Sequence, residues 1–143
     1  MTEKPDAAEL KSLNTGVVDE FRANSGRVGG AFAAANMLLL TTTGAKSGQL
    51  RTSPLIYENI DGKMLIMGSY RGADVHPLWV HNLRKNPQAH IEVGAESYDV
   101  VARELPPDEH EKVWQQLIAV APWFGEYQKL TSRVIPLFVL TRA

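Results

Sequence analysis

Residues 37–69 read "MLLLTTTGAKSGQLRTSPLIYENIDGKMLIMGS", and this stretch determines the fold that we expect. It contains three runs, 37–43, 51–60 and 63–69, in which apolar and β-branched residues predominate as they do in strands. Asp61-Gly62 separates the second run from the third, and this dipeptide favours a two-residue hairpin turn. The stretch therefore predicts three consecutive antiparallel strands, with "GAKSG" as the loop between the first two.

The rest of the chain predicts four helices and three more strands. Helices are expected at 9–25, from Pro77 to a stop at Asn86-Pro87, at 106–122 and at 123–133, and strands at 89–93, 98–105 and 134–142. Because few helices connect successive strands, this order favours an α+β fold, a mostly antiparallel closed or split β-barrel with peripheral helices, over a doubly wound parallel sheet. All 143 residues fit one domain, in which residues 1–8 are expected to be flexible.

The composition argues against several classes of function. The formal net charge is −1 and the charged residues carry both signs, so the chain offers no basic field for nucleic acid. Without cysteine it can form neither a disulfide nor a thiolate metal site. The N-terminus lacks the apolar core of a signal peptide, and no apolar run approaches the roughly 20 residues that span a bilayer. We therefore expect a cytoplasmic protein, whose amphipathic helix at 9–25 packs on the core or, as the alternative, contacts a membrane surface.

The GAKSG loop (44–48) places a lysine and a serine between two glycines. It does not match a P-loop, because Ala45 and Leu40 occupy the two required glycine positions and a strand follows in place of a helix. Two cations, Lys46 and Arg51, with several hydroxyl groups close in sequence, can hold a phosphate or a polycarboxylate tail. An ordinary solvated turn explains the same residues equally well.

A second cluster, "GSYRG" (68–72), leaves the third strand and leads to the start of a helix. Free backbone N–H groups at such a place favour anions, and Arg71 adds positive charge. Trp79 can supply a flat wall to a cofactor, although a lone tryptophan is more often part of the core.

The histidines and serines do not suggest a metal site or a hydrolase. His76 and His81 are five residues apart on a helix and do not share a face, while the other two histidines lie on other elements, so no metal is expected. Ser69 is not part of a G-x-S-x-G elbow, so hydrolysis is not expected.

The C-terminal stretch "APWFGEYQKLTSR" places Trp123, Phe124 and Tyr127 around Gly125. Trp123 and Tyr127 are four residues apart and share a helical face, so they can line an apolar pocket with one phenol as a hydrogen-bond or proton donor. A helix that docks its aromatic residues into the core is an equally good explanation.

Three stretches together, "LLLTTTGAKSGQLRTSPL", "GSYRGADVHPLWVHNLRKNP" and "YQKLTSRVIPLFVL", resemble the deazaflavin-dependent nitroreductase family of actinobacteria, whose members use coenzyme F420. The resemblance begins at about Met37 and covers most of the chain. It implies a split β-barrel that transfers a hydride from the reduced deazaflavin to a small electron-poor acceptor, with no metal and no protein nucleophile.

The resemblance also implies roles for particular residues. Lys46 and Arg51 would bind the phosphate and the polyglutamate tail of the deazaflavin. The other residues that it places at the cofactor are Ser47, Ser53, Pro54, Leu55, Met67, Gly68, Ser69, Tyr70, Arg71, His76, Pro77, Leu78 and Trp79. Trp123, Phe124 and Tyr127 would line the acceptor pocket. Tyr127, Ser69 or water would donate the proton that accompanies the hydride.

The acceptor implied by the resemblance is a quinone, an enone or unsaturated lactone, or a nitroaromatic. Ala45 and Tyr70 replace basic residues of the nitroimidazole-activating member, and Arg71 lies one place after the second. Two alternatives are a related split-barrel reductase that binds FMN and a non-catalytic deazaflavin-binding protein. A homodimer is also expected, since barrels of this type often pair.

Overall fold

The computed structural model describes residues 18–19, 21–23 and 36–143. Residues 18–19 and 21–23 are helical, and Phe21 packs on Met37 and Leu39 of the first strand. The rest of the helix expected at 9–25 and the flexible segment expected at 1–8 lie outside the described residues.

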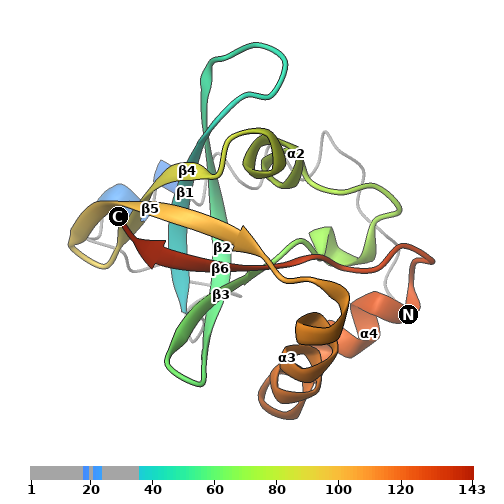
Figure 1. Cartoon of the computed structure of the whole chain (residues 1–143). Helices are drawn as coiled ribbons and strands as arrows, with labels where there is room; N and C mark the ends of the chain where they lie inside the picture. Colours follow the sequence, from blue (N-terminus) through green and yellow to red (C-terminus); the bar gives the residue numbers. More distant parts are fainter. Residues whose placement is uncertain (1–17, 20, 24–35) are drawn as a thin grey trace.

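Six antiparallel strands form a closed barrel, which confirms the predicted α+β class (Figure 1). The strands are β1 (Met37–Thr43), β2 (Leu50–Ile60), β3 (Lys63–Met67), β4 (Gln88–Val93), β5 (Glu96–Glu104) and β6 (Leu137–Arg142). Their order around the barrel is β1-β2-β3-β6-β5-β4, and β4 pairs with β1 to close it. The first three strands are consecutive in the barrel, as residues 37–69 predicted.

The turn between β2 and β3 is the hairpin that Asp61-Gly62 predicted. Asp61 has φ of 53° and Gly62 has φ of 77°, and Ile60 pairs with Lys63 across them. Positive φ at both central residues matches the right-handed twist of the flanking strands. This turn fixes the register that pairs Tyr57 with Ile66.

The described helices are α2 (Leu78–Lys85), α3 (Pro107–Val120) and α4 (Trp123–Lys129), with a short turn η2 (Tyr70–Gly72) after β3. Helices α3 and α4 pack together, away from α2 (Figure 1). None of the helices in the described part of the chain is long and apolar enough to cross a membrane.

The last strand begins three residues later than we predicted. Strand β6 starts at Leu137, whereas the prediction began at Val134. Gln128 of α4 accepts a hydrogen bond from the Ile135 amide at 2.9 Å, and Pro136 has no amide hydrogen to give to a ladder. Ile135 is therefore held by helices, since its amide binds Gln128 of α4 and its carbonyl binds His110 of α3.

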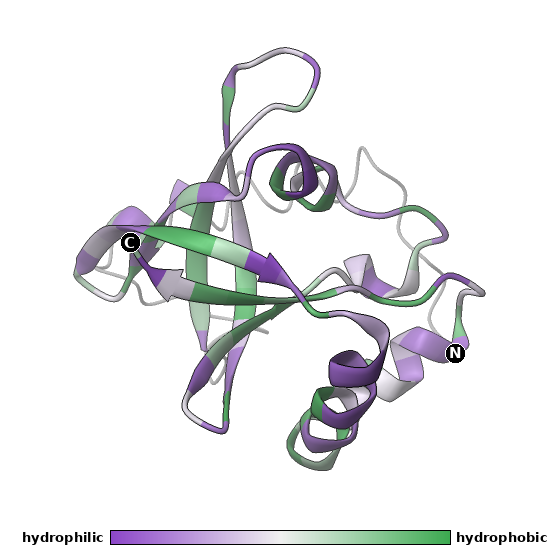
Figure 2. Ribbon diagram, viewed as in Figure 1, coloured by the Kyte–Doolittle hydropathy of each residue, from purple (hydrophilic) through white to green (hydrophobic). Residues whose placement is uncertain are grey.

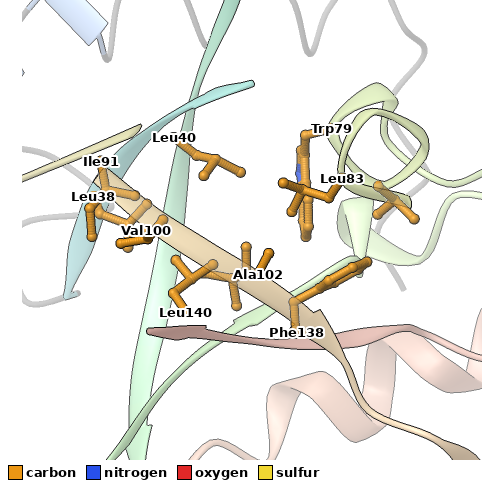
Figure 3. Close-up of a cluster of buried hydrophobic side chains, with 11 residues drawn as sticks. Leu38, Leu40, Trp79, Leu83, Ile91, Val100, Ala102, Phe138 and Leu140 are labelled. Carbon is orange, nitrogen blue, oxygen red and sulfur yellow. The ribbon is translucent and has the colours of Figure 1, made fainter. Parts of the chain in front are cut away.

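The main core fills the barrel, and α2 closes one end of it (Figure 3). Trp79 and Leu83 project from α2 toward Phe138, Leu40 and their neighbours, and the rings of Trp79 and Phe138 meet edge to face at 5.6 Å. Figure 2 shows that α2 is hydrophobic on the side that faces the barrel. Each large apolar side chain buried here contributes roughly 1.5–3 kcal/mol, which holds α2 against the strands.

The spacing of Leu78, Trp79, Asn82 and Leu83 predicts one shared face for this helix, but Leu78 does not belong to the face that α2 buries. Its side chain is 75% exposed, while the other three are buried. The reason is the helical turn of about 100° per residue, which directs Leu78 away from the barrel side that Trp79 and Leu83 occupy.

Candidate functional site

The GAKSG loop (44–48) is a compact turn closed by its own backbone. The Gly44 amide donates to the Gln49 carbonyl at 2.7 Å, and the Gly48 amide donates to the Gly44 carbonyl at 2.9 Å. Gly48 has φ of 71°, a conformation that favours glycine. Lys46 is exposed and forms no hydrogen bond or ion pair with any residue that the structure describes. Its ammonium group is therefore available to an anion.

Asn82 of α2 anchors this loop to the barrel. Its side-chain oxygen accepts from the Ala45 amide at 2.8 Å, and its side-chain nitrogen donates to the Thr42 hydroxyl at 3.0 Å. Lys85, one turn further on, donates to the Ala45 carbonyl at 2.7 Å. We did not predict this role for Asn82, and the sequence signal was a polar residue on the apolar side of an amphipathic helix.

Strand β2 carries three of the expected cofactor residues on one face, while Pro54, between Ser53 and Leu55, lies on the other. Arg51, Ser53 and Leu55 alternate along the strand and pair with Thr42, Leu40 and Leu38 of β1. Leu55 packs on the barrel core, so this row runs from the core toward the GAKSG loop. Arg51 is exposed, with one long contact of 3.4 Å to Gln49, and Ser53 has no hydrogen-bond partner among the described side chains.

The segment after β3 connects that strand to α2 and contains a left-handed turn. Tyr70, Arg71 and Gly72 all have positive φ, of 47°, 53° and 81°. A Cβ on Gly72 would lie 2.8 Å from the Leu130 Cβ and 2.9 Å from the Tyr127 carbonyl oxygen. The turn therefore packs directly against α4.

Gly68 brings the same segment against α2. A Cβ there would approach a side-chain carbon of Val80 at 2.9 Å and one of Pro136 at 2.7 Å. The hydroxyl of Ser69 and the guanidinium of Arg71 make no hydrogen bond to another residue in the described part of the chain.

Arg133 holds this segment together. Its guanidinium donates to three carbonyl oxygens, those of Ala73 at 2.7 Å, Ser69 at 2.8 Å and Gly68 at 2.9 Å. A fourth bond, 3.0 Å long, joins its Nη1 to the Nδ1 of His76. The sequence offered no signal for this role, because the partners lie 57 to 65 positions away.

His76 has its pKa lowered. Partial burial is the largest cause, followed by the positive charge of Arg133 and then those of Arg84 and His81, while Glu104 opposes the shift. The rings of His76 and His81 meet edge to face at 5.8 Å. Among the described residues, no three histidine or acidic side chains are grouped so that they could hold a metal ion.

The aromatic residues of α4 divide between core and surface. Phe124 is buried at 3% exposure, whereas Trp123 is 42% exposed and Tyr127 is half-buried. Ring centroids lie 5.7 Å apart for Trp123 and Phe124 and 5.9 Å apart for Phe124 and Tyr127. Phe124 thus belongs to the core, and Trp123 and Tyr127 are the accessible pair.

Helix α2 contacts both of the segments that carry most of the expected residues, the GAKSG loop and the segment after β3. Asn82 and Lys85 tie it to the GAKSG loop, and Val80 ties it to Gly68. Ser69, Tyr70, Arg71 and His76 follow on the segment between β3 and α2, which α4 contacts through Gly72. Four of the expected cofactor residues, Met67, Gly68, Pro77 and Trp79, are buried, and Met67 and Trp79 belong to the hydrophobic core.

The available groups fit a cofactor that carries phosphate or carboxylate groups. Lys46, Arg51 and Arg71 are exposed cations, and Ser53 and Ser69 are hydroxyl donors without partners in the described part of the chain. Cations and hydroxyl groups bind phosphate and carboxylate oxygens. The exposed Leu78 adds an apolar side chain at the start of α2, one helical turn before Asn82.

Comparison with known proteins identifies relatives of the whole barrel. Residues 15–142 match the family model described as F420H(2)-dependent quinone reductase. A protein of Mycobacterium tuberculosis named F420H(2)-dependent quinone reductase is 39% identical over 126 residues, which are 85% of each chain.

Two solved structures are also similar. One, titled as the structure of an F420-H2 dependent reductase (FDR-A), is 37% identical with a TM-score of 0.64, and the match covers 74% of this chain and 94% of that one. The other, described as a domain-swapped dimer, is 31% identical with a TM-score of 0.66, and the match covers 95% of this chain and 100% of that one.

Proposed function

The chain belongs to the F420H2-dependent quinone reductase family and uses coenzyme F420, and on this premise we propose that it transfers a hydride from reduced F420 to a quinone. The resemblance noted in the sequence is thereby confirmed at the level of family, fold, cofactor and enzyme class. Quinones come first among the acceptors because similar proteins carry that name, and enones, unsaturated lactones and nitroaromatics follow as electron-poor compounds of similar size.

The observation that carries the proposal is the anchored loop with unpaired cations. Asn82 and Lys85 hold the backbone of Ala45, which fixes the position from which Lys46 projects. Lys46 and Arg51 then bind the phosphate and the anionic tail without first giving up an ion pair to a described residue. Ser47 contributes a hydroxyl at the same turn.

The deazaflavin ring of F420 then lies between strand β2 and the segment that follows β3. In our proposal, Ser53, Pro54 and Leu55 border it from β2, and Ser69, Tyr70, Arg71 and His76 border it from the segment between β3 and α2. When bound in its reduced form, F420 supplies the hydride. The chain's own task is to orient that ring, exclude water and present the acceptor at the open face.

The acceptor then lies against α4. Trp123 and Tyr127 offer accessible aromatic surface, and the Tyr127 hydroxyl has no hydrogen-bond partner among the described residues. A quinone gains one hydride and one proton when it becomes a hydroquinone, so a donor is required. Tyr127 is that donor in our proposal, and Ser69 is the second candidate.

Self-association of this protein is also part of our proposal. It is supported by the similar chain that is described as a domain-swapped dimer. Contact of the N-terminal helix with a membrane and a cytoplasmic location both stay predictions from the sequence.

A turnover assay tests the proton donor. The assay follows the reaction of reduced F420 with a quinone. We expect Tyr127→Phe to lower kcat by roughly 10²-fold or more, which is the usual size of a general-acid contribution. The affinity for the cofactor should stay within about twofold of wild type. Ser69→Ala is the comparison variant, and Tyr57→Phe on β2 is the matched control. Unchanged turnover in Tyr127→Phe would assign the proton to Ser69 or water.

A further inference from the structure

The left-handed turn after β3 needs support from outside itself. Tyr70 and Arg71 carry a Cβ, and residues with a Cβ rarely adopt φ near +50°. Within the turn, the Gly72 amide donates to the Ser69 carbonyl at 2.8 Å and the Ala73 amide to the Tyr70 carbonyl at 3.1 Å. Strained backbone of this kind persists where surrounding structure holds it, and it is concentrated at functional sites.

Arg133 forms hydrogen bonds to the backbone before and after the turn. It binds the carbonyl oxygens of Gly68 and Ser69, which precede the turn, and that of Ala73, which follows it. Arg133 is itself held by α4, because Gln128 donates to the Arg133 carbonyl at 2.6 Å. Four of the five guanidinium donors are accounted for when the bond to His76 is added.

The bond to His76 determines where the imidazole carries its proton. A guanidinium has only donors, so His76 Nδ1 must be the acceptor, and the ring is then neutral with its proton on Nε2. The lowered pKa of His76 is consistent with a neutral ring. The charged and titratable groups around it are Arg133, Arg84 and His81 of α2, and Glu104 of β5. Glu104 is engaged by Arg84 through two bonds of 2.8 and 2.9 Å.

We propose that Arg133 is the positioning residue of the cofactor site: it holds the turn Tyr70–Gly72 and fixes His76 as the neutral Nε2–H tautomer. His76 thereby presents a hydrogen-bond donor, and not a cation, on the side of its ring away from Arg133. Nε2 has no partner among the described residues, so the donor is available to a carbonyl oxygen of the bound deazaflavin ring. The identity of that ligand rests on the proposed function, whereas the tautomer does not.

The first test uses the protein without cofactor. Nitrogen-15 NMR of histidine-labelled protein should show His76 at neutral pH with Nδ1 unprotonated and Nε2 protonated, and its titration midpoint should lie below that of an ordinary histidine. Arg133→Met should move the midpoint upward and mix the two tautomers, while Arg142→Met, which removes an arginine that stacks on Tyr98, should change neither. A wild-type His76 that is charged or protonated on Nδ1 would overturn the proposal, even if Arg133→Met does not fold.

The second test measures F420 binding by fluorescence titration. Arg133→Lys keeps the charge but cannot reach four acceptors, so we expect this variant to bind F420 at least about tenfold more weakly than wild type. Arg142→Met should bind F420 as wild type does. His76→Gln, which keeps an N–H donor, should bind more tightly than His76→Leu. Equal affinity of Arg133→Lys and wild type would contradict the positioning role. Failure of the wild type to bind F420 would instead refute the proposed function, and the NMR result would still decide the tautomer.

Discussion

At the scale of single residues, the GAKSG loop depends on the buried amide of Asn82. Its two bonds satisfy the Ala45 amide and the hydroxyl of Thr42, which is only 1% exposed. The sequence could predict Lys46 and Arg51 as binding residues, because exposed cations beside glycines have a direct chemical meaning. It could not predict which groups Asn82 and Arg133 bind, because those partners lie between 37 and 65 positions away in the chain.

Removal of the Asn82 amide tests this dependence. Asn82→Ala should lower the free energy of unfolding by about 2–4 kcal/mol, since it leaves a buried hydroxyl without a partner and opens a small cavity. It should also weaken F420 binding, because Lys46 is no longer held in place. Urea denaturation and a fluorescence titration measure the two effects, with the exposed Asn59→Ala on β2 as the control. An Asn82→Ala protein that binds F420 as well as wild type would show that the loop does not need the anchor.

His76 predicts a pH dependence of stability. Its pKa in the folded protein is lowered, chiefly by burial and then by Arg133, so the unfolded chain binds the proton more readily. Stability contributed by the neutral ring is then present above the ordinary histidine pKa of about 6.5 and is lost as the pH falls toward the folded value. The difference in unfolding free energy between wild type and His76→Gln should therefore shrink on acidification through this window. A difference that stays constant from pH 7 to pH 5 would contradict the lowered pKa.

At the scale of elements, the turns were the most predictable parts and the ends of strands were the least. Asp61-Gly62 predicted its hairpin because few dipeptides adopt two positive φ values. The start of β6 was misplaced because "VIP" has strand-like composition, while the Gln128 side chain, from α4, binds its backbone. The left-handed turn at Tyr70–Gly72 was not predicted, since only one of its three residues is a glycine.

Two glycines give a matched test of these turns. Both Gly48 and Gly72 have positive φ, but a Cβ on Gly48 would meet no atom within 4 Å, whereas one on Gly72 would meet Leu130 and Tyr127. Gly48→Ala should therefore cost about 1–2 kcal/mol of unfolding free energy, and Gly72→Ala should cost more, because the backbone strain is joined by contacts below 3 Å. Thermal or urea denaturation compares them. Equal costs would mean that η2 and α4 separate easily.

At the scale of the whole molecule, the barrel explains how a chain of 143 residues can hold a large cofactor. One end is closed by α2, and the loop after β1, the strand β2 and the segment after β3 surround that end. The sequence predicted this architecture because few helices connect its strands, which argues against a doubly wound parallel sheet. It could not show that Trp79 and Phe124 are buried in the core, because an aromatic residue on a helix can be buried or exposed until its packing is known.

The most direct measurement is a titration of the purified protein with oxidised F420 and, in parallel, with FMN, followed by tryptophan fluorescence. We predict saturable quenching by F420 and little quenching by FMN. Lys46→Gln and Arg51→Gln should each bind F420 at least about tenfold more weakly, because each loses a charged bond to the cofactor. The control Lys112→Gln on α3 should bind F420 as wild type does. Quenching by FMN alone, by neither compound, or equally in all three variants would contradict the assignment of the GAKSG loop as the anion clamp of an F420 site.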